Sequence, residues 1–214
     1  MPRSKAQISV SLDGYMAGPN QSEENPLGEG GMDLHEWVFK LAHWQREHGR
    51  GGGEGEENPS NSVIAAAQEN VGAVVMGRNM FGPVRGEWPD EDWKGWWGDE
   101  PPFHTPVFVL THHVRPSFTL GETTFHFVDA DPARALELAR EAARGKDVRL
   151  GGGATTIRQF LDADLVDTMH VAVSRVEIGS GSRLWRSPDE LRDRFHVDVV
   201  PSPSGVTHHL FWRR

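Results

Sequence analysis

A run of glycines after a short apolar segment is the strongest chemical signal in the sequence. Val148-Arg-Leu150 leads directly into Gly151-Gly152-Gly153-Ala154-Thr155-Thr156. A strand that turns without side chains into a helix lets a ligand approach the backbone closely, and the start of the helix favours an anion. The spacing matches neither the Gly-x-Gly-x-x-Gly fingerprint nor a Walker loop, so a tight turn without a ligand is an equally good interpretation.

Two further apolar segments also end in polar groups. Val75-Met76 leads into Gly77-Arg78-Asn79, and Val109-Leu110 leads into Thr111-His112-His113, followed by Arg115. Alone, Arg78 reads as a solvated surface charge. The adjacent histidines point to opposite sides of an extended chain, which argues against a shared metal. Together the three segment ends predict a site for a phosphorylated ligand.

The elements that must position these groups alternate between strands and helices. Apolar runs and alternation predict strands, and three- and four-residue spacing predicts helices. The expected strands are 7–12, 73–76, 107–110, 124–128, 147–150, 166–173, 195–200 and 206–212. The expected helices are one from Asp33 through Trp44 with Asp33 and Glu36 as a capping box, a short one through 65–67 capped by Asn61 or Ser62, 132–144, and one that includes 157–161. This order predicts an α/β fold with a mixed sheet and a closing antiparallel pair.

Composition narrows the function. The chain has 214 residues, no cysteine and a formal charge of −9 from 22 basic and 31 acidic residues. The acidic balance argues against a nucleic-acid partner, and no apolar run reaches the roughly 18 residues of a membrane span. Without cysteine there is no disulfide, no thiolate zinc site and no cysteine nucleophile. We expect one cytoplasmic domain over 1–214, with no membrane partner and no metal.

Two segments stand apart from the strand and helix pattern. The stretch 49–60 is rich in glycine and acid and is expected to be a flexible insertion. The stretch 83–104 is expected to be an irregular loop, with Trp88, Trp93, Trp96 and Trp97 among acids and prolines. We interpret these tryptophans first as a folded-over cluster, and alternatively as a pocket wall or a subunit interface.

Four motifs in order give the chain a family resemblance. Ile8-Ser-Val-Ser-Leu-Asp-Gly-Tyr-Met-Ala-Gly18, Val75-Met-Gly-Arg78, Val109-Leu-Thr-His112 and Leu150-Gly-Gly-Gly-Ala-Thr155 resemble the dihydrofolate reductase-like superfamily. The similarity is greatest to the branch that contains the reductase domain of bacterial riboflavin biosynthesis. It implies a three-layer α/β/α fold around a mixed, mainly parallel sheet, with NADPH bound across the strand ends.

The resemblance also assigns cofactor residues. Gly77, Arg78 and Asn79 would take the phosphate side, and Thr111, His112 and His113 the adenosine ribose and its 2′-phosphate. Gly151, Gly152, Gly153, Ala154 and Thr155 would hold the pyrophosphate and face the nicotinamide. Val10, Ala17 and Gly18 would border the nicotinamide, under a mobile loop from Asp13 to Gly18.

Reduction of a C=O or C=N group also needs a proton. The resemblance places an acid near the start of the first helix, so Asp33 is the candidate donor and Glu36 the reserve. The sequence before Asp33 departs from the Pro-Trp approach of dihydrofolate reductases, and a plain N-cap is the alternative. Asp13, Trp37 and Phe81 are candidate substrate contacts, although Asp13 also fits a turn and Trp37 a core position.

The expected activity is NADPH-dependent reduction of a flat heterocycle. The substrate would resemble 5-amino-6-(5-phosphoribosylamino)uracil, with a dihydrofolate or other pterin as the alternative. A non-catalytic NADP-binding protein on the same fold is a second alternative. A hydrolase is disfavoured because there is no nucleophile elbow. This branch is commonly dimeric, and the apolar strand 166–173 is a candidate interface in a homodimer.

Overall fold

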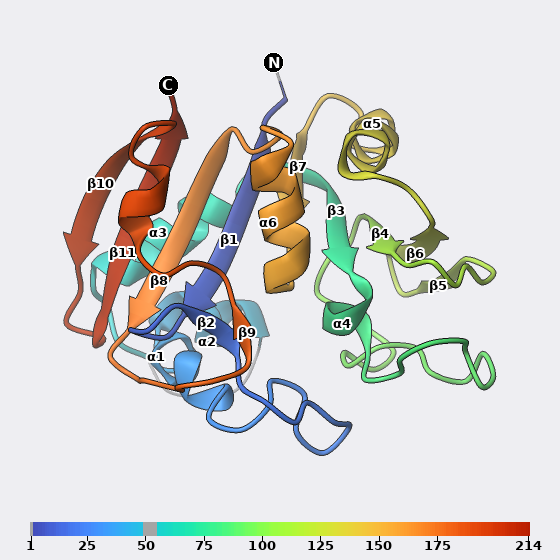
Figure 1. The fold of residues 1–214 in the computed structure, drawn as a ribbon, viewed down its shortest axis with the longest axis horizontal. Coiled ribbons are helices and arrows are strands. Elements are labelled where there is room, and N and C mark those ends of the chain that lie inside the picture. Colours follow the sequence, from blue (N-terminus) through green and yellow to red (C-terminus); the bar gives the residue numbers. More distant parts are fainter. Residues whose placement is uncertain (1, 49–54) are drawn as a thin grey trace. The chain divides into compact units, whose positions relative to one another are not determined.

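The computed structural model describes residues 2–48 and 55–214, and these form two compact units (Figure 1). Unit 1 comprises the chain up to Ala6, Ser22–Pro26 and Asn70–Asp167. Unit 2 comprises Gln7–Gln21, Leu27–Glu69 and Thr168–Arg214. The predicted flexibility of 49–54 lies outside the described residues, and the prediction of a single domain stays a prediction.

Unit 1 is built on parallel strands. Its strand order is β1-β7-β3-β4-β6-β5, and every neighbouring pair is parallel except β5 with β6. The strands are β1 (Ser4–Val10, of which the first three residues belong here), β3 (Val71–Gly77), β4 (Pro106–Leu110), β5 (Phe118–Leu120), β6 (Thr123–Val128) and β7 (Asp147–Leu150). The helices are α4 (Arg78–Phe81), α5 (Pro132–Ala142) and α6 (Ala154–Asp162).

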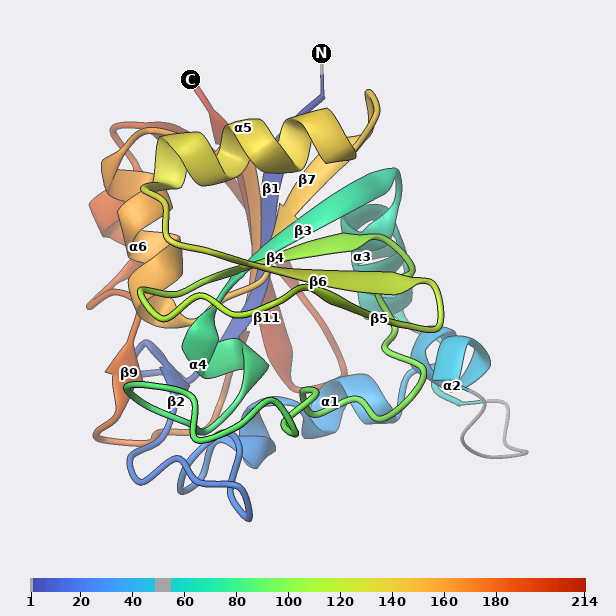
Figure 2. The same cartoon turned by 90° about the vertical axis from the view of Figure 1, so that its right-hand side faces the viewer.

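Helix α5 covers one face of this sheet. It packs against β3, β4 and β7, and Figure 2 shows it lying across them. The helix begins where the sequence favours it, because Pro132 occupies the first turn and the Asp131 side chain accepts from the Arg134 N–H at 2.8 Å. Leu136 and Ala139 are buried, as predicted.

An aromatic cluster forms the core of unit 1. Its buried members are Val74, Met76, Phe81, Val107, Val109, Phe125 and Phe127. Each fully buried phenylalanine contributes roughly 1.5–3 kcal/mol of hydrophobic free energy. The stretch 83–104 contains no helix or strand, and Trp88, Trp93 and Trp97 pack against this cluster. The tryptophan-rich stretch is therefore the folded-over loop that the sequence predicted.

Unit 2 is built on antiparallel strands. Its strand order is β10-β11-β8-β1, with Gln7 to Val10 of β1 belonging here. The elements are β8 (Thr168–Ser174), β10 (Phe195–Pro201), β11 (Val206–Arg213), a small pair formed by β2 (Tyr15–Ala17) and β9 (Ser182–Arg183), the short 3₁₀ helices η1 (Met32–Leu34) and η2 (Pro188–Leu191), and the helices α1 (Glu36–Phe39), α2 (Ala42–His48) and α3 (Pro59–Gln68). Trp37, Val38, Leu41 and Ile64 pack with Ala172 and Val206 in its core.

The mixed, mainly parallel sheet and the closing antiparallel pair are confirmed, and so is the dihydrofolate reductase-like fold class. The prediction of one helix from Asp33 to Trp44 is wrong. The chain forms η1, α1 and α2 instead, because Glu56 forms a bridge with Leu41. The Lys40 carbonyl accepts from the Glu56 N–H at 2.8 Å, and the Ala42 N–H donates to the Glu56 carbonyl at 3.1 Å.

Three other sequence predictions need correction. Helix α3 is capped by Asn58, whose side chain accepts from the Ser60 N–H at 2.9 Å, so neither Asn61 nor Ser62 is the cap. Pro59 and Ser60 consequently belong to α3 and not to an insertion reaching residue 60. Strand β8 lies between β11 and β1 with its residues 169–172 buried, so it is an interior strand and not an exposed interface. No helix among residues 2–48 and 55–214 is long and apolar enough to cross a membrane.

A chain of buried polar side chains crosses the core of unit 2. His170 Nε2 lies 2.8 Å from His208 Nδ1, and His208 Nε2 lies 2.8 Å from Ser60 Oγ. One of the two facing ring nitrogens must carry a proton and the other a lone pair, so the pair tolerates no extra proton. Burial, with the nearby His208, lowers the pKa of His170 to about 3, and burial, with His209, lowers the pKa of His208 to about 4.

This pair predicts acid sensitivity of the fold. The unfolded histidines bind protons below about pH 6.5, whereas the folded pair does so only near pH 3–4. The free energy of unfolding therefore falls as pH drops from 6.5 to about 4, by on the order of 1 kcal/mol per pH unit for each ring. Urea unfolding of His170→Gln/His208→Gln should show a shallower pH dependence than the wild type. Exposed His196→Gln is the control, and equal slopes in all three proteins would contradict the prediction.

Candidate functional site

Three turns that the sequence singled out meet at one edge of the sheet in unit 1. Strands β7, β3 and β4 are parallel neighbours, so their carboxyl ends lie together. The Gly77 N–H donates to the Gly152 carbonyl at 2.6 Å, which joins the turn after β3 to the turn after β7. The Arg78 Nη1 donates to Thr111 Oγ1 at 3.4 Å, which joins the turn after β3 to the turn after β4.

The glycine run ends in an uncapped helix. Helix α6 starts at Ala154, and its N-cap residue, Gly153, offers no side-chain hydrogen bond. The first N–H groups of a helix lack partners within it, so this turn presents donors to a ligand or to solvent. A Cβ built at Gly153 would meet nothing within 4 Å, whereas Gly152 and Ala154 are buried and Thr155 is exposed. The peptide between Gly152 and Gly153 is cis.

Gly77 is required by close approach and not by its backbone angle. A Cβ at this position would lie 2.2 Å from Thr156 Oγ1, well inside van der Waals contact. Its φ of −78° is open to any residue. The glycine therefore allows the turn after β3 to pack directly on the start of α6.

Arg78 is held in an unusual environment for a cation. Its guanidinium carbon lies 3.7 Å from the centroid of the Trp88 ring, and its Nη1 donates to the Gly86 carbonyl. Its Nε and Nη2 are buried and have no hydrogen-bond partner. Burial, and then the charges of Arg85 and Arg115, lower the pKa of Arg78. Buried unpaired donors on a charged group are costly, so this arrangement suits an anion that supplies acceptors.

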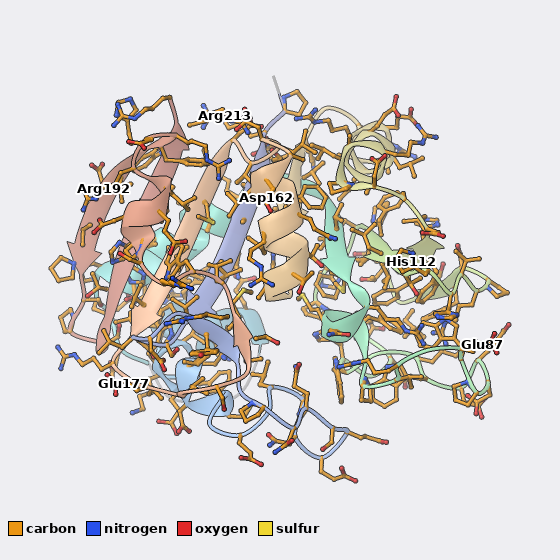
Figure 3. The ribbon with its side chains drawn as sticks, in the orientation of Figure 1. Glu87, His112, Asp162, Glu177, Arg192 and Arg213 are labelled. Carbon is orange, nitrogen blue, oxygen red and sulfur yellow. The ribbon has the colours of Figure 1, made fainter. Side chains whose placement is uncertain are left out.

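The turn after β4 differs from its predicted role in one respect. Thr111 is buried, and its hydroxyl contacts both the His113 N–H at 3.1 Å and Arg78. The His112 side chain is 92% exposed and its Nδ1 lies 2.9 Å from Asp129 Oδ1 (Figure 3). A neighbouring carboxylate disfavours a phosphate at His112. Contact of His112 with a 2′-phosphate stays a prediction.

Asp13, in unit 2, uses its carboxylate to fasten a loop. It accepts from Ser11 Oγ at 2.6 Å, from the Gly179 N–H at 2.7 Å and from the Ile178 N–H at 3.2 Å. Burial raises the pKa of Asp13, but the hydrogen bonds from these groups outweigh it and leave the pKa below its usual value. Those bonds account for Asp13 without a substrate, and its substrate role stays a prediction.

The other predicted residues of unit 2 are placed as follows. Val10 and Ala17 are buried, and a Cβ at Gly18 would lie 1.9 Å from the Glu29 carbonyl oxygen, so packing alone explains that glycine. Asp33 lies inside η1 and Gly31 is its N-cap, so the expectation that Asp33 caps a helix is wrong. Asp33 and Glu36 are both exposed.

The two aromatic candidates are core residues. Trp37 is buried, and its Nε1 donates to the Leu34 carbonyl at 2.9 Å. Phe81, in unit 1, has no exposed surface and belongs to the aromatic cluster. Packing explains both residues, and their contact with a substrate stays a prediction. Asn79 is exposed beside Arg78.

Sequence reasoning did not place Trp88 beside Arg78 and Arg115. The Arg115 guanidinium carbon lies 4.3 Å from the centroid of the Trp88 ring. The only available signal was the high tryptophan content of an aperiodic loop, which does not say where the loop folds. Among the described residues, no group of three histidine or acidic side chains is arranged to hold a metal ion.

Comparison with known proteins places this geometry in context. The family described as RibD C-terminal domain matches residues 5–198. A structure from Shewanella sp. PV-4, assigned provisionally to riboflavin biosynthesis, has a TM-score of 0.58 at 22% identity over 99% of both chains. A Thermotoga maritima deaminase/5-amino-6-(5-phosphoribosylamino)uracil reductase gives 0.53 at 15% identity, and the present chain, matched in full, spans 57% of its length.

A third structure extends the similarity in fold. Dihydrofolate reductase from Enterococcus faecalis, complexed with NADP(H), gives a TM-score of 0.51 at 10% identity, over 99% of this chain and 96% of that one. At these identities the solved structures show a common fold. No curated protein matches the sequence.

The contact at Gly77 predicts a matched pair of substitutions. Gly77→Ala should destabilise the protein by roughly 1–3 kcal/mol, because the new methyl group overlaps Thr156 Oγ1. Adding Thr156→Ala removes that oxygen and should restore part of the loss, since the Thr156 Cβ lies 3.5 Å away. Gly153→Ala, in open space, is the control for stability. Urea unfolding measures all four variants, and a Gly77→Ala protein as stable as the control would refute the packing argument.

Proposed function

The chain belongs to the RibD C-terminal domain family, and on that premise we propose that it is an NADPH-dependent reductase of a flat heterocyclic substrate. The observation that carries this proposal is Arg78. Its unpaired donors lie in the same turn as Gly77, whose N–H is bonded to the open glycine run before α6.

The residues of unit 1 suit a dinucleotide phosphate. Arg78 would hold a phosphate through charge-assisted hydrogen bonds, and Gly151 to Thr155 would hold the pyrophosphate through backbone N–H groups. Two features support the fit: the buried orphan nitrogens of Arg78, and the cradle at Gly77 that a single Cβ would fill. When bound, NADPH would supply the hydride, and the protein orients it and excludes water. The nicotinamide role of Val10, Ala17 and Gly18 stays a prediction.

The proposed substrate is a pyrimidine related to 5-amino-6-(5-phosphoribosylamino)uracil. The name of the Thermotoga maritima relative supports this choice. A pterin is the alternative, supported by the similarity in fold to a dihydrofolate reductase. The expected homodimer and cytoplasmic location are also proposals.

A proton must accompany the hydride. Asp33 is the proposed donor, and Glu36, three residues later, is the reserve. Both side chains are exposed, so each can exchange protons with solvent. If neither acts, a water molecule must deliver the proton, or the protein binds the cofactor without turnover.

Cofactor binding is the first test. Titration calorimetry with NADPH should give saturable binding to the wild type, and Arg78→Gln should weaken it by roughly tenfold to a hundredfold, the value of a charged hydrogen bond. Arg134→Gln, on the exposed face of α5, should leave the affinity unchanged. A wild type that does not bind NADPH would overturn the proposed function.

Turnover is the second test. Loss of NADPH absorbance should follow addition of the aminopyrimidine or, for the alternative, of a dihydropterin. Asp33→Asn should lower kcat by about a hundredfold or more with little change in NADPH affinity, as expected for loss of a general acid. Glu36→Gln is the comparison, since a larger loss there would move the role to Glu36. Unchanged kcat in both would exclude them as donors, and NADPH binding without turnover of either compound would favour the non-catalytic alternative.

A further inference from the structure

Two arginines of unit 1 share one tryptophan. The guanidinium carbons of Arg78 and Arg115 lie 3.7 Å and 4.3 Å from the centroid of the Trp88 ring. Arg115 also lies 4.5 Å from the centroid of the Phe127 ring, and its Nη2 donates to the Trp93 carbonyl at 2.5 Å. Arginine stacks well on aromatic rings, so the loop and the strand ends are joined through this pair.

Stacking leaves most of the donors of these two side chains unused. Arg78 Nε and Nη2 and Arg115 Nε and Nη1 are buried without a hydrogen-bond partner. Over the residues that the structure describes, neither guanidinium forms an ion pair within 4.0 Å, although Glu91 and Asp90 exert a longer-range attraction on Arg115. Arg85 adds a third positive charge near Arg78.

Packing alone does not account for this arrangement. An apolar side chain would fill the same space without burying a charge, and a buried charge without acceptors opposes folding. Four unpaired donors on two neighbouring cations match the several oxygens and the double charge of a phosphomonoester. A phosphodiester, with one charge, matches them less well.

A short surface segment covers these donors. The Gly86 carbonyl accepts from Arg78 Nη1, and Trp88 Nε1 donates to the His113 carbonyl at 2.6 Å. Gly86 and Glu87 are exposed, and Glu87 lies at the outer side of the loop in Figure 3. The segment Val84–Trp88, which we call the cover, is therefore held by few polar contacts and has solvent on its outer side.

We propose that Arg78 and Arg115 form a phosphomonoester site, and that the cover occupies it until a phosphate dianion takes the place of the Gly86 carbonyl. The inference rests on the proposed function and deepens it. It makes Arg115 and Trp88 the residues that distinguish a dinucleotide carrying a 2′-phosphate from one that lacks it.

Binding of adenosine 2′-phosphate and of adenosine tests the site without the rest of the cofactor. Calorimetry should show the wild type binding the phosphate at least tenfold more tightly than adenosine. Arg115→Met, which keeps much of the stacking volume, should reduce that preference about tenfold or more. Arg134→Met, at an exposed arginine, is the matched control. An unchanged preference in a folded Arg115→Met protein would overturn the role of Arg115.

The cover is tested by amide hydrogen exchange. Exchange of the peptide that contains Val84–Trp88 should become faster when adenosine 2′-phosphate saturates the protein, because the ligand displaces the Gly86 carbonyl. Trp88→Phe keeps a ring but loses the bond to the His113 carbonyl, so it should bind the phosphate several-fold more tightly. Slower or unchanged exchange, or unchanged or weaker binding by Trp88→Phe, would overturn the cover.

These outcomes are separable from those of the proposed function. If adenosine 2′-phosphate binds as expected but NADPH does not, the reductase proposal fails and the phosphomonoester site stands. If NADPH and NADH bind equally well and Arg115→Met changes neither affinity, the site fails while a dinucleotide-dependent reductase remains.

Discussion

The hydrogen bond from the Gly77 N–H to the Gly152 carbonyl is the contact on which the candidate site depends. At 2.6 Å it joins two turns that are separated by more than seventy positions in the chain. It forms because β3 and β7 are parallel neighbours and because Gly77 has no side chain to hold Thr156 away. Arg78 follows immediately, so its position relative to the glycine run is set by backbone contacts.

The electrostatics of the site run against those of the whole chain. A protein with a formal charge of −9 concentrates Arg78, Arg85 and Arg115 around one aromatic loop, where burial lowers the pKa of each. Even so, arginine remains charged under any ordinary condition. The loop therefore encloses positive charge within an acidic protein, and a small anion meets attraction only at short range, within about one Debye length.

Local patterns predicted the elements that hold the site, and long-range contacts decided the rest. Strands β3, β4 and β7 were found because uninterrupted apolar runs are typical of buried parallel strands. The break between α1 and α2 was not predictable, because it depends on Glu56, which lies fifteen positions after Leu41. The interior position of β8 was missed because an apolar run looks the same inside a sheet and at an interface. The cluster of Arg115 with Trp88 was missed because an aperiodic loop gives no sign of where its side chains pack.

The bridge between Leu41 and Glu56 has a consequence for protein engineering. Two backbone hydrogen bonds, from Glu56 to Lys40 and from Ala42 to Glu56, fix where the chain returns. Once both ends are fixed in this way, the entropy of closing the intervening chain grows only with the logarithm of its length, by about 0.6 kcal/mol for each doubling. The stretch between His48 and Gly55 is therefore a suitable place to splice in a peptide epitope or a reporter domain, far along the chain from the glycine run and Arg78.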